Sequence, residues 1–171
     1  PRLVGEVAET ADMLQIGSRS MQNFPLLREV GRTRTPVLIK RGWSATLEEW
    51  LCAAEYVAAE GNRDIVLCER GVRASCHWSY ARNVLDLNVI EPVRRATPLP
   101  ILADPSHATG QWRLVAPMSL AAVAAGGGLF ALIYGLTGSL WAPMVVHAVM
   151  DIASGRMAFA AANPEAHGTS S

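Results

Sequence analysis

Short apolar runs alternate with longer amphipathic stretches along the first part of the chain. The apolar runs favour strands, and polar residues flank them. The predicted strands are Leu3–Val7, Met13–Gly17, Val37–Lys40, Ile65–Cys68 and Ile101–Ala103. These runs are apolar on both faces, as buried strands of parallel sheets are. Strands that alternate with helices predict βαβ units and an α/β fold.

The amphipathic stretches predict the helices between these strands. The clearest helix lies over Thr46–Glu60, where Thr46 and Glu49 form a capping box and Gly61 follows as a C-cap. The other predicted helices lie over Asn23–Val30 with an end at Gly31, over Asn83–Ala96 with a break at Pro92, and from Trp112 onward.

Polar or charged residues follow every predicted strand after the first. In a (β/α)8 barrel the carboxyl ends of the strands build the active site, so this layout predicts an incomplete TIM barrel of about five βα units. A doubly wound open sheet is the alternative, but no glycine-rich dinucleotide fingerprint follows any strand. A half-barrel leaves two strand edges unpaired, which favours a homo-oligomer.

The predicted strand ends carry the chemistry of an anion-binding site. The cations there are Arg19, Lys40, Arg41 and Arg70. Guanidinium and ammonium groups suit phosphate oxygens, so we expect them to bind a phosphorylated substrate. His107, beside Asp104, is a candidate ligand for a divalent metal. The alternatives are loop charges that face solvent and a histidine held by structural hydrogen bonds.

Charge is unevenly distributed along the 171 residues. Basic and acidic residues number 15 each, and this balance argues against a nucleic-acid partner. No Asp, Glu, Lys or Arg occurs from Leu114 to Met150, so we expect membrane association through 114–150. Pro1 is not followed by a charged and then apolar leader, and we expect the part before this run to be cytoplasmic.

Five motifs occur in one order along the first part of the chain. They are ADMLQIGSRSMQNFPLLREVGRT (11–33), PVLIKRGWSATLEEWLCAAEYVAAEG (36–61), IVLCERGVR (65–73), ARNVLDL (81–87) and LPILADPSHATG (99–110). Over about residues 1–126 the chain closely resembles the metal-dependent type I 3-deoxy-7-phosphoheptulonate (DAHP) synthases, which are related to the 3-deoxy-octulosonate-phosphate synthases. The resemblance implies a TIM barrel transferase. It condenses phosphoenolpyruvate with erythrose 4-phosphate in the shikimate pathway of aromatic amino-acid biosynthesis.

The resemblance also implies roles for individual residues. The family's phosphoenolpyruvate-binding cations fall on Arg19, Lys40 and Arg70, and its histidine metal ligand falls on His107. Lys40 and His107 are therefore the expected catalytic residues, with a divalent metal of the Mn, Fe, Co or Zn class as cofactor. The family's cysteine, glutamate and aspartate ligands and its lysine-proline-arginine motif for erythrose 4-phosphate have no match. The loop ASCHWSY (74–80) also departs from the family's text. We therefore expect impaired activity.

A second resemblance begins after the glycine triplet at 126–128. The segment LFALIYGLTGSLWAPMVVHAVMDIASG (129–155) resembles the end of the CPBP family of CAAX-protease-like intramembrane metalloproteases. His147 and Asp151 match that family's polar pair, four residues apart on one helix face. We expect two domains, 1–126 and 127–171, in a truncated or chimeric chain. The alternative functions are an intramembrane protease fragment and a non-catalytic phosphate-binding half-barrel.

Overall fold

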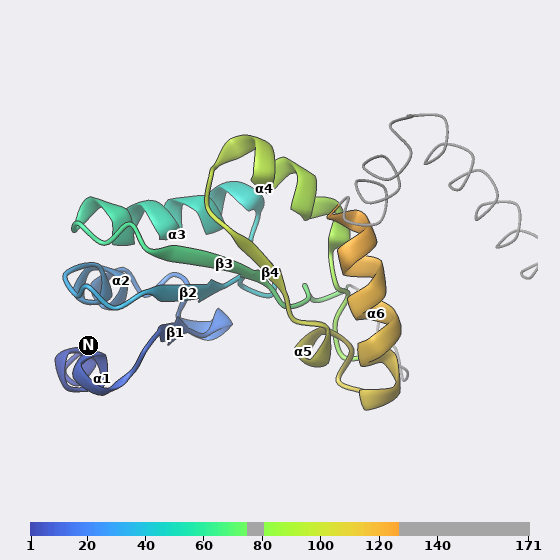
Figure 1. Cartoon of the computed structure of the whole chain (residues 1–171), viewed down its shortest axis with the longest axis horizontal. Coiled ribbons are helices and arrows are strands. Elements are labelled where there is room, and N and C mark those ends of the chain that lie inside the picture. The colour runs from blue at the N-terminus through green and yellow to red at the C-terminus, as the bar shows by residue number, and fades with distance from the viewer. Residues whose placement is uncertain (75–80, 127–171) are drawn as a thin grey trace, which may run out of the picture. The chain divides into compact units, whose positions relative to one another are not determined.

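Four parallel strands form the sheet that positions the site. The computed structural model describes residues 1–74 and 81–126, which belong to one compact unit (Figure 1). The strands are β1 (Leu14–Ile16), β2 (Val37–Lys40), β3 (Ile65–Glu69) and β4 (Ile101–Ala103). They pair in chain order, β1-β2-β3-β4, and all pairs are parallel. The described strands thus show no reversal of order of the kind that defines a doubly wound sheet.

Helices precede, connect and follow these strands. They are α1 (Val4–Thr10), α2 (Phe24–Gly31), α3 (Leu47–Ala59), α4 (Ile90–Ala96), α5 (Pro105–Thr109) and α6 (Trp112–Ala125), with 3-10 turns η1 (Ser18–Ser20) and η2 (Leu87–Val89). Helices α2 and α3 pack against each other, and α3 runs along the sheet (Figure 1). Gly31 allows this close approach, because a Cβ there would lie 2.5 Å from the carbonyl oxygen of Val57.

The hydrophobic core lies between this helical layer and one face of the sheet. Val37, Ile39 and Leu67 are fully buried there against Trp50 and Val57 of α3. The indole Nε1 of Trp50 donates a hydrogen bond to the Ile39 carbonyl at 3.1 Å, so the ring is fixed against β2. The predicted capping box of α3 is confirmed in both of its hydrogen bonds.

Three sequence-based predictions of local structure are wrong. The helix predicted over Asn83–Ala96 begins only at Ile90, because Val84 forms a bridge with Val72 and a 3-10 turn precedes α4. The run Leu3–Val7 is not a strand, because Val4–Thr10 forms helix α1. Val4, Ala8 and Ala11 pack against the core, and their spacing is helical. Pro92 does not break a helix, because it lies in the first turn of α4, where no backbone N–H is needed. The described residues therefore hold four of the five predicted strands.

The second face of the sheet and its two edges have no cover among residues 1–74 and 81–126. Gln15 on β1 is exposed, Leu38 on β2 is half-buried, and Leu102 on β4 is 52% exposed. Strands β1 and β4 each have a single partner strand within this range. Within the same range, no helix has the length and apolar character needed to cross a membrane.

Candidate anion-binding site

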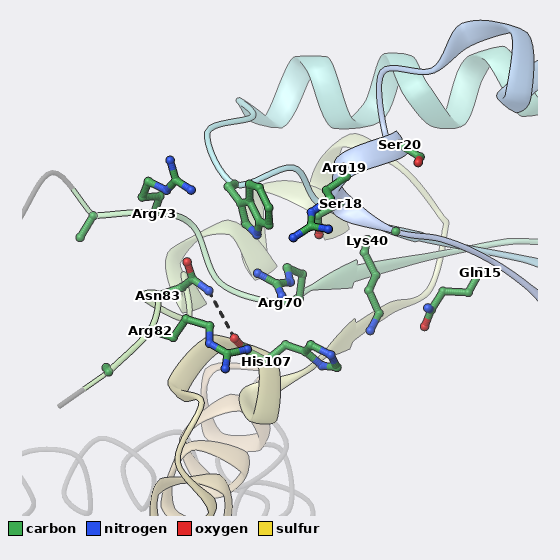
Figure 2. A pocket seen from close by; sticks show the side chains of 14 residues that line it. Gln15, Ser18, Arg19, Ser20, Lys40, Arg70, Arg73, Arg82, Asn83 and His107 are labelled. Carbon is green, nitrogen blue, oxygen red and sulfur yellow. Dashed lines mark hydrogen bonds between the residues drawn. The ribbon is translucent and has the colours of Figure 1, made fainter. Parts of the chain in front are cut away.

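A pocket of about 1200 Å³ lies at the carboxyl ends of the strands (Figure 2). Each strand end contributes to its wall: Gly17–Ser20 follow β1, Lys40 ends β2, Arg70 follows β3, and His107 lies in α5 after β4. The cationic side chains that line it are Arg19, Lys40, Arg70, Arg73 and Arg82, and among the described residues no Asp or Glu contributes to the lining. Three of the four cations predicted from the strand ends therefore meet in one place.

Arginine side chains surround the ring of Trp43 in this pocket. The guanidinium carbons of Arg19, Arg70 and Arg73 lie 5.4, 6.0 and 5.3 Å from its ring centroid. An aromatic face attracts such cations and leaves their N–H groups available to a ligand. Arg70 is only 7% exposed, and its Nε and Nη1 have no hydrogen-bond partner among the described residues. These donors require an acceptor, because buried unpaired polar groups are rare and costly.

Asp104 joins Lys40 to His107 at the end of β4. Its Oδ2 lies 3.0 Å from Lys40 Nζ and 2.7 Å from His107 Nδ1. Partial burial favours the neutral acid, but hydrogen bonds from the Ser106 hydroxyl, the His107 backbone N–H and Lys40 together hold the pKa of Asp104 well below its usual range. The ionised carboxylate fixes the Lys40 ammonium and accepts a hydrogen bond from Nδ1–H of His107, which leaves Nε2 of His107 to face a ligand.

Arg41 does not line the pocket, although it was predicted to bind substrate. Its Nη1 lies 3.0 Å from Glu69 Oε2 and 2.8 Å from Asp86 Oδ2, and its Nε donates to the carbonyl of Ala45. Burial raises the pKa of Glu69, although Gly71 N–H and Arg41 stabilise its ionised form. The ion pairs with Glu69 and Asp86 fix the Arg41 guanidinium. The pair with Glu69 also anchors the chain directly before Arg70.

The described residues do not complete a metal site. Across 1–74 and 81–126, no three His, Cys, Asp or Glu side chains gather closely enough to hold an ion. His107 offers Nε2 as one ligand, but its neighbour Asp104 already pairs with Lys40. The site therefore does not fit a divalent metal by itself. His147 and Asp151, predicted for the tail, lie outside the described residues.

Sequence reasoning missed Trp43, Arg73 and Arg82. All three lie within the five quoted motifs, and Trp43 comes three residues after Lys40. Their positions in the chain give no sign that they line the same pocket, because loops rather than strands carry them.

Known proteins match the part of the chain that contains the five motifs. The family model described as the DAHP synthetase I family matches residues 1–137, which extends past the domain boundary predicted at 126. A phospho-2-dehydro-3-deoxyheptonate aldolase from Thermotoga maritima is 50% identical over 121 residues, 71% of this chain and 35% of the relative. A 2-dehydro-3-deoxyphosphooctonate aldolase from Francisella tularensis is 31% identical over 137 residues, 73% of this chain and 48% of the relative.

A solved structure shows that the fold is shared as well. It is a truncated form of 3-deoxy-D-arabino-heptulosonate 7-phosphate synthase from Thermotoga maritima, with a TM-score of 0.70 and 48% sequence identity. The match covers 73% of this chain and 46% of that chain. This chain thus spans between about a third and a half of the length of the curated relatives that it matches.

Proposed function

Because this chain belongs to the DAHP synthetase I family, we propose that it carries the phosphoenolpyruvate-binding part of a 3-deoxy-7-phosphoheptulonate synthase. Enzymes of this type condense phosphoenolpyruvate with erythrose 4-phosphate. The observation that carries the proposal is the convergence of Arg19, Lys40 and Arg70 on one pocket from three neighbouring strand ends (Figure 2).

The charges of this pocket suit the two anionic groups of phosphoenolpyruvate. Arg70 presents two unpaired donors of one guanidinium, Nε and Nη1, and phosphate or carboxylate oxygens are suitable acceptors for such N–H groups. Lys40 adds an ammonium whose position Asp104 fixes. Arg19 stands against the same indole ring as Arg70, so their charges act on the same region of the pocket. Arg41 has a positioning role in this proposal, since its guanidinium is held by two carboxylates.

Turnover needs more than this anion site. The family's condensation joins the enol carbon of phosphoenolpyruvate to the aldehyde carbon of the second substrate. We assign His107 Nε2 as one ligand for a divalent metal, oriented by Asp104 through Nδ1. We derive no step through the metal, because the described residues leave its site incomplete. The proposal therefore includes binding with weak or absent condensation activity.

Titration calorimetry with phosphoenolpyruvate tests the binding. We expect the full chain to bind it and Arg70→Gln to lose at least about tenfold in affinity, because a charge-assisted hydrogen bond is lost. Arg63→Gln is the matched control, since Arg63 is exposed and precedes β3 at the opposite end of the sheet. Circular dichroism establishes that both variants fold. Absence of binding by the folded wild type, or equal losses in the two variants, refutes the proposal.

An assay of condensation separates the alternative functions. Formation of the seven-carbon product with added Mn²⁺ supports a synthase, whereas binding without product supports a phosphate-binding half-barrel. The metalloprotease-like tail, membrane association through 114–150 and a cytoplasmic location of the remainder stay predictions. Retention of the chain in membranes after an alkaline wash would support the first two of these predictions, and release would count against them.

A further inference from the structure

Trp43 lies on the middle one of three neighbouring strand-end loops. It follows β2, which pairs with β1 on one side and with β3 on the other. Arg19 lies in η1 after β1, whereas Arg70 and Arg73 follow β3. The sheet order therefore places one aromatic side chain between loops that bring arginines from both sides.

We propose that Trp43 is a positioning residue for anion binding, whose indole ring holds Arg19, Arg70 and Arg73 as one cationic cluster before a ligand arrives. This inference rests on the proposed function and deepens it. Arg19 and Arg70 contact the anion, and Trp43 acts through them. Figure 2 shows Arg19 and Arg70 close together in the pocket, with Arg73 on the side away from Lys40.

The three guanidinium groups of this cluster repel one another. Their guanidinium carbons all lie within 6.0 Å of the centroid of one ring. Across residues 1–74 and 81–126, none of the three forms an ion pair with a carboxylate. Arg70 is also buried, and charges near a buried group are screened least. Without a ligand, the exposed side chains of Arg19 and Arg73 would extend into solvent unless another group held them.

The indole ring supplies this contact without using the donors of the arginines. Among aromatic side chains, tryptophan attracts a cation over its face most strongly. The ring offers no hydrogen-bond acceptor, so the guanidinium N–H groups stay available to an anion. A carboxylate in its place would cancel the charge and occupy the donors, as Glu69 does with Arg41. Trp43 therefore keeps the cations in place and leaves their binding capacity to the ligand.

The loop that carries Trp43 is fixed independently of the indole ring. The Ala45 N–H donates to the Gly42 carbonyl at 3.2 Å, and Arg41 Nε donates to the Ala45 carbonyl at 3.0 Å. The Trp43 carbonyl accepts a hydrogen bond from the Arg73 N–H at 2.7 Å. Because none of these bonds uses the ring, its replacement should leave the path of the loop unchanged.

Titration calorimetry of the full chain with phosphoenolpyruvate tests the role of the ring. Trp43→Leu removes the aromatic face, whereas Trp43→Phe keeps one. We expect Trp43→Leu to lower the affinity at least about tenfold and Trp43→Phe to stay within about threefold of wild type. Trp112→Leu is the matched control, since Trp112 is 81% exposed, has Arg113 5.5 Å from its ring and does not line the pocket. Its affinity should equal that of wild type.

A double-mutant cycle shows whether Trp43 acts through the arginines. In an Arg70→Gln background, Trp43→Leu should lower the affinity by less than about threefold, because part of the cluster that the ring holds is gone. Equal losses in the two backgrounds would show a general disturbance of the pocket and refute the positioning role. Equal affinities of Trp43→Leu and Trp43→Phe would refute it as well. If circular dichroism shows that Trp43→Leu is unfolded, Trp43→Met takes its place under the same criteria.

Inorganic phosphate as a second probe separates this inference from the proposed function. If the wild type binds phosphate but not phosphoenolpyruvate, the proposed function fails. The phosphate affinities of the same variants then decide on Trp43 by the same fold-changes. If phosphoenolpyruvate binds and the Trp43 variants match the wild type, the inference fails and the proposed function stands. If the folded wild type binds neither anion, both fail.

Discussion

Replacement of Arg41 by methionine should destabilise the fold strongly, because it leaves a buried carboxylate without its ion pair. Glu69 is fully buried, and Arg41 lies 3.0 Å from it. Removal of one partner of a buried pair costs about 3–5 kcal/mol. Most of this loss should come from Glu69, since Asp86 retains a quarter of its exposure and stays partly solvated. A domain of typical stability, about 5–15 kcal/mol, keeps little margin after such a loss.

Urea denaturation measures the change. For a slope near 2 kcal/mol/M, a loss of about 4 kcal/mol moves the midpoint by about 2 M. Arg63→Met, at an exposed position before β3, should change stability by less than about 0.5 kcal/mol. The double variant Arg41→Met/Glu69→Gln should recover most of the loss, because a neutral amide replaces the unpaired carboxylate.

The loss should also depend on pH. Without Arg41 the pKa of Glu69 rises further above its unfolded value of about 4.3. Between the unfolded and the folded pKa, the folded state binds more protons than the unfolded state, so the free energy of unfolding falls as pH rises. The gap between wild type and Arg41→Met should therefore be wider at pH 8 than at pH 5. A loss below about 1 kcal/mol, or a gap that does not change with pH, would refute the reasoning.

Three further predictions concern the sheet and the loops around the pocket. Gly71→Ala should lower the free energy of unfolding by about 1–3 kcal/mol in urea denaturation, because φ is 96° and the added Cβ would lie 2.8 Å from α5. Gly17→Ala is the control, since it has open space and should leave the stability unchanged, and equal losses would contradict this. The depressed pKa of Asp104 contributes stability above about pH 3.9 that is lost as pH falls through the folded pKa. In Asp104→Asn, the free energy of unfolding from urea denaturation should therefore fall less steeply as the pH is lowered, and an unchanged slope would contradict this. If copies of the chain associate through the open edge of β4, Leu102→Glu should lower self-association in sedimentation velocity. The control Leu3→Glu, at an exposed position near the N-terminus, should not change it, and equal effects of the two variants would argue against association through β4.

The sequence predicts the strands that begin at Val37, Ile65 and Ile101 well, because each apolar run is bounded by polar residues. The run Leu3–Val7 fails for a physical reason, since five apolar-rich residues satisfy both a strand and one turn of a helix. Packing of α1 on the core then decides between the two.

The opposite directions of successive side chains at the end of β2 explain why Lys40 lines the pocket and Arg41 does not. Successive side chains of a strand point to opposite faces. Lys40 therefore lines the pocket, and Arg41 turns to the buried Glu69. Arg73 and Arg82 could not be predicted as a pair, because the bridge between Val72 and Val84 is a tertiary contact that no local pattern encodes.

The chain order of the strands has a consequence for how the sheet is made during translation. Each strand after the first pairs with the strand synthesised just before it. Within β1–β4 each new strand can thus add to the one made before it, and no later described segment inserts between two of these strands. Translation at about 5–20 residues per second gives each βα unit seconds to dock before the next one emerges. The ribosome thereby sets the sequence of assembly, and the nascent chain avoids the search for distant partners that slows other β topologies.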